Sequence, residues 1–225
     1  MRIKIPAAIG DAVRERNLVK RIVFYILGLI VMAFGISMSI RADIGVAPGS
    51  TVAYAASRLS PLTIGQCSAC FHVFCMLAQL MITRKPKITL LLQLPLAYVF
   101  GLLIDIFYDL LIITPPNMLY SILLMLAALF VFSLGIRAIV GADILLAPPD
   151  GLARTIGNVF GWPMSKAKLV FDIVATAAAA LVTLILAGDV FLAVGVGTII
   201  CAAGTGPIIG LFTKLLPFLD LNPGK

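Results

Sequence analysis

Two aspartates in copies of one motif are the residues of this sequence whose type and setting most suggest chemistry. Asp43 and Asp143 each stand in Ala-Asp-Ile-x-x-Ala-Pro, and each interrupts strongly apolar sequence. A carboxylate at membrane depth is costly, so it normally faces a cavity, a partner or the interface. The chemistry expected of such residues is proton exchange or cation binding. The alternative is that both lie at the headgroup level and cap short helices.

The residues that follow each aspartate are typical of a helix start. Pro48, Gly49 and Ser50 follow the first and Pro148 and Asp150 the second, with Ser50 and Asp150 as expected N-caps. If the short helices dip into the membrane, their free N–H groups and partial positive charge would suit an anion at a midplane site. If they lie flat in the interface, they serve only for packing. Both interpretations remain open from the sequence.

Three further titratable residues fall in apolar segments and are candidates for proton or ion coupling. His72 and Asp172 occupy matching positions, each directly after a phenylalanine, and such a pair could relay protons. Asp105 and Asp109 lie on one face near the outer end of the third apolar segment, where a solvated mouth explains Asp109 and Asp105 is the better site candidate. Cys67 and Cys70 would share a helix face from which His72 points away, so we expect no metal site.

Two arginines and two glycines in apolar segments have simpler explanations. Arg41 and Arg137 could pair with carboxylates or hold an anionic substrate, although snorkelling to headgroups is the simpler expectation. Gly206 and Gly210 are small enough to let membrane helices approach closely. The sequence contains no nucleotide-binding loop, Ser-His-Asp set or zinc-protease signature, so we expect neither an enzyme nor a cofactor.

The composition predicts that these residues belong to a membrane domain. The chain is 61% hydrophobic and 12% charged, with a mean hydropathy of +1.12, whereas soluble domains are about a quarter charged. The net charge of +7 does not indicate nucleic-acid binding, because six basic residues precede the first apolar run, where lipid headgroups or water surround them. We expect the lipid bilayer to be the main partner.

Six apolar windows approach the length of about 20 residues that a membrane-spanning helix needs. Pro95 should kink the third window and Pro207 the sixth. Short helical patterns at 50–59 and 150–160 follow the first and fourth windows. The windows are 22–40, 62–83, 88–113, 118–140, 164–187 and 191–213.

The basic residues orient the spans. With the N-terminus inside, the inner connections and ends carry 15 of the 17 Lys and Arg residues, which predicts that both termini are cytoplasmic. Three spans per copy of the motif would invert one copy relative to the other, as in many secondary transporters. We therefore expect a basic segment at 1–21, a first repeat at 22–114 and an inverted second repeat at 118–216, joined by an uncharged turn.

The motifs also carry a resemblance to a known family. Residues 40–65, with Gly-x-x-Pro, a short helix and then Thr-x-Gly, resemble the YczE/YyaS/YitT family of bacterial integral membrane proteins. Gly101-Leu-Leu-Ile-Asp105 and Gly195-Val-Gly-Thr198 are similar to two further motifs of that family. The resemblance implies a helical membrane fold in the bacterial inner membrane and does not assign an activity.

Together these observations predict an all-α, polytopic membrane protein of two inverted three-helix repeats. We expect a small secondary transporter or permease with its site at the two motif copies, working by alternating access. For the solute, the helix starts favour an anion, and for the coupling ion, the titratable residues favour a proton. The alternative is an accessory or assembly protein of the membrane that transports nothing. At 225 residues a homodimer is plausible.

Overall fold

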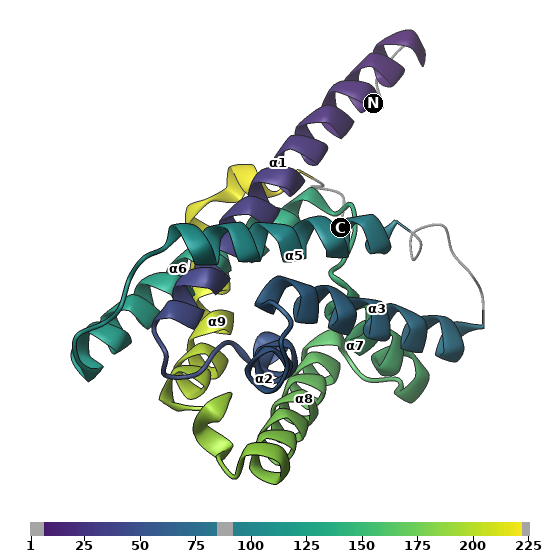
Figure 1. Ribbon diagram of the computed structural model, residues 1–225. Helices are drawn as coiled ribbons and strands as arrows, with labels where there is room; N and C mark the ends of the chain where they lie inside the picture. Colours follow the sequence, from purple (N-terminus) through teal and green to yellow (C-terminus); the bar gives the residue numbers. More distant parts are fainter. Residues whose placement is uncertain (1–6, 85–91, 222–225) are drawn as a thin grey trace.

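The computed structural model describes residues 7–84 and 92–221, and within these ranges the chain forms only helices and the turns between them (Figure 1). The first helix is a long rod whose N-terminal part extends beyond the rest of the molecule (Figure 1). The predicted all-α fold is confirmed. The elements are α1 (Ala7–Arg41), η1 (Pro48–Ser50), α2 (Thr51–Leu59), α3 (Ile64–Thr83), α5 (Gln93–Leu110), α6 (Met118–Ala142), α7 (Pro148–Phe160), α8 (Met164–Ala187), η2 (Val190–Leu192), α9 (Val196–Leu215) and η3 (Pro217–Leu219).

Six helices are long and apolar enough to cross a membrane, namely α1 from Leu18 onward, α3, α5, α6, α8 and α9. Their 18 to 25 residues, at about 1.5 Å per residue, roughly match the hydrocarbon thickness. Each predicted window coincides with one of them. The window 88–113 begins outside the described residues, and the window 191–213 begins too early, because η2 and a turn precede α9.

The helices α1 and α6 form the centre of the molecule and touch backbone to backbone. A Cβ atom added at Gly35 would lie 2.5 Å from the backbone nitrogen of Phe132, and one added at Gly135 would lie 2.5 Å from that of Met32. Only glycine allows so close an approach. As residue numbers rise along α1 they fall along its contacts in α6, so the two helices run antiparallel.

Each short helix packs against a long helix from the other half of the chain. The helix α2 contacts α8 and α7 contacts α3, in addition to the long helix that follows each of them. The non-helical segment that precedes each short helix, called a break below, is also hydrogen-bonded to the other half of the chain. Gly197 donates its N–H to the carbonyl of Ile44 at 2.7 Å, and the side-chain amide of Gln93 donates to the carbonyl of Leu146 at 3.1 Å. The two halves therefore interlock at both breaks.

Two sequence expectations about helix packing are wrong. Pro95 does not kink its helix, because α5 begins at Gln93 and a first-turn proline removes no intrahelical hydrogen bond. Gly206 and Gly210 do not form a close helix contact, since an added Cβ would meet no atom of the described structure within 4 Å at either position. Pro207 does lie inside α9, as predicted.

Candidate functional site

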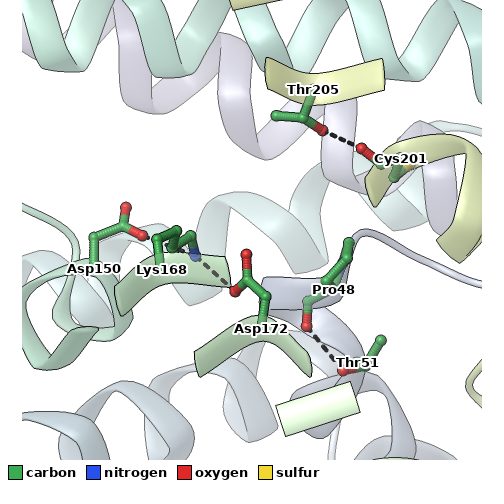
Figure 2. A network of polar contacts seen from close by, with 7 residues as sticks. All are labelled: Pro48, Thr51, Asp150, Lys168, Asp172, Cys201 and Thr205. Atoms are coloured by element: carbon green, nitrogen blue, oxygen red, sulfur yellow. Dashed lines mark hydrogen bonds and ion pairs between the residues drawn. The ribbon is translucent and has the colours of Figure 1, made fainter. Parts of the chain in front are cut away.

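Lys168 joins two aspartates near the start of α8 (Figure 2). Its ammonium nitrogen lies 2.9 Å from a carboxylate oxygen of Asp150 and 2.8 Å from one of Asp172. The side chains are 33%, 33% and 23% exposed for Lys168, Asp150 and Asp172. One positive and two negative charges give this triad a formal charge of −1. Lys168 and Asp172 lie about 6 and 12 Å along α8 from its first residue, inside the membrane-spanning length.

The starts of both short helical segments meet at this triad. Asp150 is the third residue of α7. From the other half of the chain, a Cβ added at Gly49 would lie 3.5 Å from the Lys168 nitrogen and 3.9 Å from an oxygen of Asp172. Figure 2 shows Pro48 and Thr51 of that segment beside Asp172. Helix starts carry partial positive charge, which offsets the repulsion between the two carboxylates.

The middle of α3 lies beside the triad and contributes two more titratable groups. His72 lies within electrostatic reach of Asp150, and Cys75 within reach of both Asp150 and Lys168. The His72 ring stacks on Phe100, with the ring centroids 5.8 Å apart, and its buried Nδ1 has no hydrogen-bond partner in the described part of the chain. His72 and Asp172 therefore approach one cluster from different helices, and no hydrogen bond joins their side chains in the described part of the chain.

The start of α7 is fixed by α3. The Gln79 side-chain amide donates to the carbonyl of Pro148 at 3.0 Å, and a Cβ added at Gly151 would lie 2.5 Å from the Gln79 side-chain oxygen. A glycine directly after Asp150 thus lets α7 approach α3 closely. This contact sets the position of Asp150 beside the triad.

Asp43 lies in a separate pocket of about 680 Å³, together with Tyr54, Arg58 and Asp105. The Tyr54 hydroxyl donates to the Asp43 carboxylate at 3.4 Å. Burial, reinforced by the Asp43 charge, raises the pKa of Tyr54 to about 12. The phenol therefore keeps its proton near neutral pH and remains a donor to Asp43.

Asp143 lines a second pocket of about 600 Å³, which also includes Gln79, Gln93 and Arg154. Arg21 of α1 donates from Nε to the carbonyl of Ala142 at 2.7 Å and from Nη2 to the carbonyl of Asp143. These contacts tie the end of α6 to α1.

The expectation of one site at the two motif copies is wrong for the aspartates themselves, because Asp43 and Asp143 line different pockets. Each aspartate terminates one helix of the antiparallel pair α1 and α6, and the ends of such a pair point in opposite directions. Both residues have left-handed backbone, with φ of 54° and 47°, a conformation that aspartate tolerates better than most residues. Each aspartate lets the chain turn at the end of its helix, and the helical segments that follow the two turns meet at Lys168.

Asp105 is bound to the start of α3 and does not reach the triad. Its carboxylate accepts a hydrogen bond from the Thr63 hydroxyl at 2.6 Å and from the Gly65 N–H at 2.7 Å. A carboxylate at a helix start satisfies N–H groups that have no intrahelical partner. Asp105 thereby ties α5 to α3, a structural role that the sequence did not indicate.

The expected N-caps are confirmed only in part, since Ser50 is the N-cap residue of α2 whereas Asp150 lies inside α7. Ala47 and Ala147 precede the first turns at Pro48 and Pro148, and neither Ser50 nor Asp150 makes a capping hydrogen bond through its side chain. A residue before proline is pushed toward extended backbone, so each Ala-Pro pair starts a helical segment without help from a polar side chain. Asp150 is consequently available to Lys168.

Neither arginine considered as a snorkelling residue reaches away from the protein. Arg41 lies over the Tyr108 ring, 3.8 Å from its centroid, and donates to the Tyr108 carbonyl at 2.6 Å. Arg137 is only 3% exposed. Sequence reasoning also missed Lys168, which was counted only among the 15 basic residues of the inner connections and ends. The signal that could have found it is the four-residue spacing to Asp172, which places both on one helix face.

The comparisons with known proteins agree with this fold. Residues 19–214 match the model of a family of unknown function, DUF6198. The chain belongs to this family. It is 30% identical over 204 residues to the uncharacterized membrane protein YczE of Bacillus subtilis (strain 168), covering 87% of this chain and 86% of that one. It is 26% identical over 209 residues to the uncharacterized protein YyaS of the same organism, covering 88% and 96%.

These relatives include the ones that the motifs around Asp43 and Asp105 predict, so the suspected YczE/YyaS relationship is confirmed. No solved structure matches the chain. With six apolar helices and a family that includes a membrane protein, the chain is a helical membrane protein.

Proposed function

We propose that this protein is a small secondary transporter that carries an anionic solute together with a proton. The observation that carries the proposal is the triad of Asp150, Lys168 and Asp172 where both short helical segments begin. Charged residues inside membrane proteins are costly and normally mark substrate or ion pathways. Transporters of inverted repeats place helix starts at substrate and ion sites within the membrane.

The two pockets lie toward opposite ends of α3. Thr63 and Ile64, at the start of α3, line the pocket of Asp43, whereas Gln79 and Thr83, near its end, line the pocket of Asp143. Opposite ends of a spanning helix lie at opposite membrane faces. His72, which is close to Asp150, lies between these ends. We propose that each pocket is the vestibule of one face.

Protonation of a triad carboxylate is the proposed coupling step. A proton on Asp172 neutralises one of the two carboxylates on Lys168 and frees donors of the ammonium for a solute anion. The nearby start of η1 adds partial positive charge. The titratable groups that interact with Asp172 are Lys168 on its own helix and Asp150 of α7, and His72 and Cys75 of α3 lie within electrostatic reach of Asp150.

The arrangement of equivalent helices supports alternating access between inverted halves. The first long helices of the halves, α1 and α6, are antiparallel. The contact of α2 with α8 in one direction has its counterpart in the contact of α7 with α3 in the other. Rocking of one half against the other would exchange which pocket is open. We further propose that both termini are cytoplasmic in a bacterial inner membrane, because the basic residues concentrate on that side.

The test is a solute screen in proteoliposomes that contain a trapped pH-sensitive dye. Carboxylates, amino acids and inorganic anions are added outside, and solute-dependent acidification of the lumen is recorded. We expect at least one anion to drive proton entry in the wild type, with a loss of at least tenfold in Asp172→Asn. Asp189→Asn, which changes an exposed aspartate outside the triad and outside both pockets, should leave the flux unchanged.

Two outcomes would count against the proposal. If no solute moves protons although the protein is folded and correctly inserted, the accessory or assembly role becomes the better explanation. If a solute does so but Asp172→Asn and Asp150→Asn retain full flux, transport does not use the triad.

A further inference from the structure

The helix α6 carries a group of buried polar atoms that the proposed transport site does not use. Arg137 lies five residues before the last residue of α6, with a side chain 4% exposed. Its Nε and Nη2 donate no hydrogen bond to any residue that the structure describes. One helical turn earlier, the fully buried Ser133 hydroxyl also lacks a partner. Buried donors without acceptors are costly and rare, and their presence calls for an explanation.

These atoms face the seam between α6 and α9. On α6, Leu129 lies against Gly204 of α9, and steps of four residues lead from it along one side of the helix to Ser133, Arg137 and Gly141. At the end of this row, Gly141 lies against the carbonyl of Leu219 in η3. The row is therefore enclosed by α9 on one side and by the C-terminal segment at its end.

Asp220 neutralises Arg137 without satisfying its donors. An Asp220 carboxylate oxygen lies 3.4 Å from the Arg137 Nη2, beyond good hydrogen-bond distance, and the Asp220 side chain is 56% exposed. Among the described residues, one backbone hydrogen bond joins this segment to α6, from the Leu221 N–H to the Gly141 carbonyl at 3.1 Å. The aspartate is thus a loosely held counter-ion that can leave without unfolding a helix.

The free edge of Arg137 has the geometry of an oxyanion receptor. The Nε and Nη2 donors point the same way from a planar group, and this fork matches two oxygens of a phosphate. Arg137 lies about 7.5 Å along α6 from its end. The headgroup region of each leaflet is about 5–7 Å thick, so this depth suits a lipid phosphate as well as a free phosphate once the exposed Asp220 carboxylate moves away from Arg137.

We propose that Arg137 and Ser133 form a phosphate-binding site between α6, α9 and η3, and that Asp220 occupies it loosely in the absence of phosphate. Phosphate, either as the free ion or as the headgroup of an anionic lipid, displaces the Asp220 carboxylate and takes both donors of the fork. The site is independent of the triad and does not require that the protein transports anything.

The test is thermal unfolding of the purified full-length protein in detergent, with two separate probes. One is inorganic phosphate, and the other is dioleoylphosphatidylglycerol compared with dioleoylphosphatidylcholine. A ligand of the folded state raises the unfolding temperature in a concentration-dependent manner. In the wild type we expect such a shift with at least one probe. A shift with both identifies any accessible phosphate as the ligand, and a shift with phosphatidylglycerol alone identifies the lipid headgroup.

Three variants decide the location of the site. Asp220→Asn removes the internal competitor and should lower the half-saturating probe concentration several-fold. Arg137→Lys keeps the charge but not the fork, so the shift should need at least tenfold more probe. Lys214→Gln removes an exposed charge near the same end of α9 and should respond like the wild type.

The proposal is overturned if neither probe shifts the wild type. It is equally overturned if Arg137→Lys responds as the wild type does, or if Lys214→Gln loses the response to the same extent, since general charge attraction would then suffice. Because Arg137→Lys retains the counter-ion of Asp220, the variant keeps the buried charge pair, and its own unfolding without probe serves as the folding control.

Discussion

Lys168 is the residue on which the triad depends, because it alone separates two carboxylates within the bundle. In Lys168→Met the two aspartates lose their cation, and we expect a loss of about 1–3 kcal/mol in unfolding free energy. This is less than the 3–5 kcal/mol of a fully buried pair, because the side chains remain partly exposed. Adding Asp172→Asn should restore part of the loss. Chemical unfolding in detergent measures both.

The matched control is Lys166→Met, which removes an exposed lysine that lies over the Trp162 ring. We expect a change within about 0.5 kcal/mol, as is usual for surface substitutions. An equal loss in Lys166→Met, or a double variant that is less stable than Lys168→Met, would show that the triad is not an energetic unit.

Asp105 provides a second test at the level of single residues. Asn in its place keeps the shape but loses the charge that accepts from Thr63 and Gly65. We expect Asp105→Asn to lower the unfolding free energy by about 1–2 kcal/mol, the usual value for a helix-start acceptor. Thermal unfolding measures the change. Asp109→Asn, four residues further and exposed, should be neutral, and equal effects of both would contradict the assigned role.

The sequence revealed the site residues incompletely, for a physical reason. The duplicated motif drew attention to Asp150, and the matched position of Asp172 to a coupling role. The sequence could not show that Asp43 and Asp143 serve the turns. The only trace of a left-handed backbone in a single sequence is a residue type that tolerates it, such as aspartate. Lys168 was missed because a lysine near a helix end is usually solvated.

At the scale of the helices, the glycines of α1 and α6 decide whether the centre of the molecule forms. A Cβ at Gly135 would lie 2.5 Å from the backbone nitrogen of Met32, so a valine there must push α1 and α6 apart. We expect Gly135→Val to reduce stability by more than 3 kcal/mol, in the range of severe overpacking, and to reduce the yield of monodisperse protein. Size-exclusion chromatography and thermal unfolding would measure both.

Gly210→Val is the control for this substitution, since its added Cβ meets no neighbour within 4 Å. The variant should stay folded, with a loss near zero. If it were as damaging as Gly135→Val, helix propensity or insertion would explain the effect better than the contact with Met32.

The helices themselves were the most predictable feature, because hydropathy responds directly to the bilayer. Their starts were less so. The third apolar window includes residues that precede α5, and Pro95 consequently falls in a first turn where its effect is small. Ala47 and Ala147, which start the short helical segments, carry no cap signal at all, and only the proline after each reveals the position.

At the scale of the whole molecule, the relation between the halves was the least accessible to sequence reasoning. The repeat predicts two similar units, but which elements touch across the halves depends on packing between residues far apart in the chain. Gln93 with Leu146 and Gly197 with Ile44 are such contacts. The equivalent helices are also not used alike, since α3 packs along α5 whereas α8 and α9 make no comparable contact in the described structure.

The final prediction tests the two pockets as vestibules of opposite faces. In a variant whose four cysteines are replaced, Ser57→Cys should react with an impermeant maleimide from the outer face only and Thr155→Cys from the inner face only, because these residues line different pockets. Leu181→Cys, on the exposed apolar side of α8, should stay unreactive under lipid. If one half rocks against the other, adding Lys168→Met should change the two labelling rates several-fold in opposite directions. Labelling of both pockets from the same face would contradict alternating access. Labelling rates that Lys168→Met leaves unchanged would show that the triad does not control such a motion.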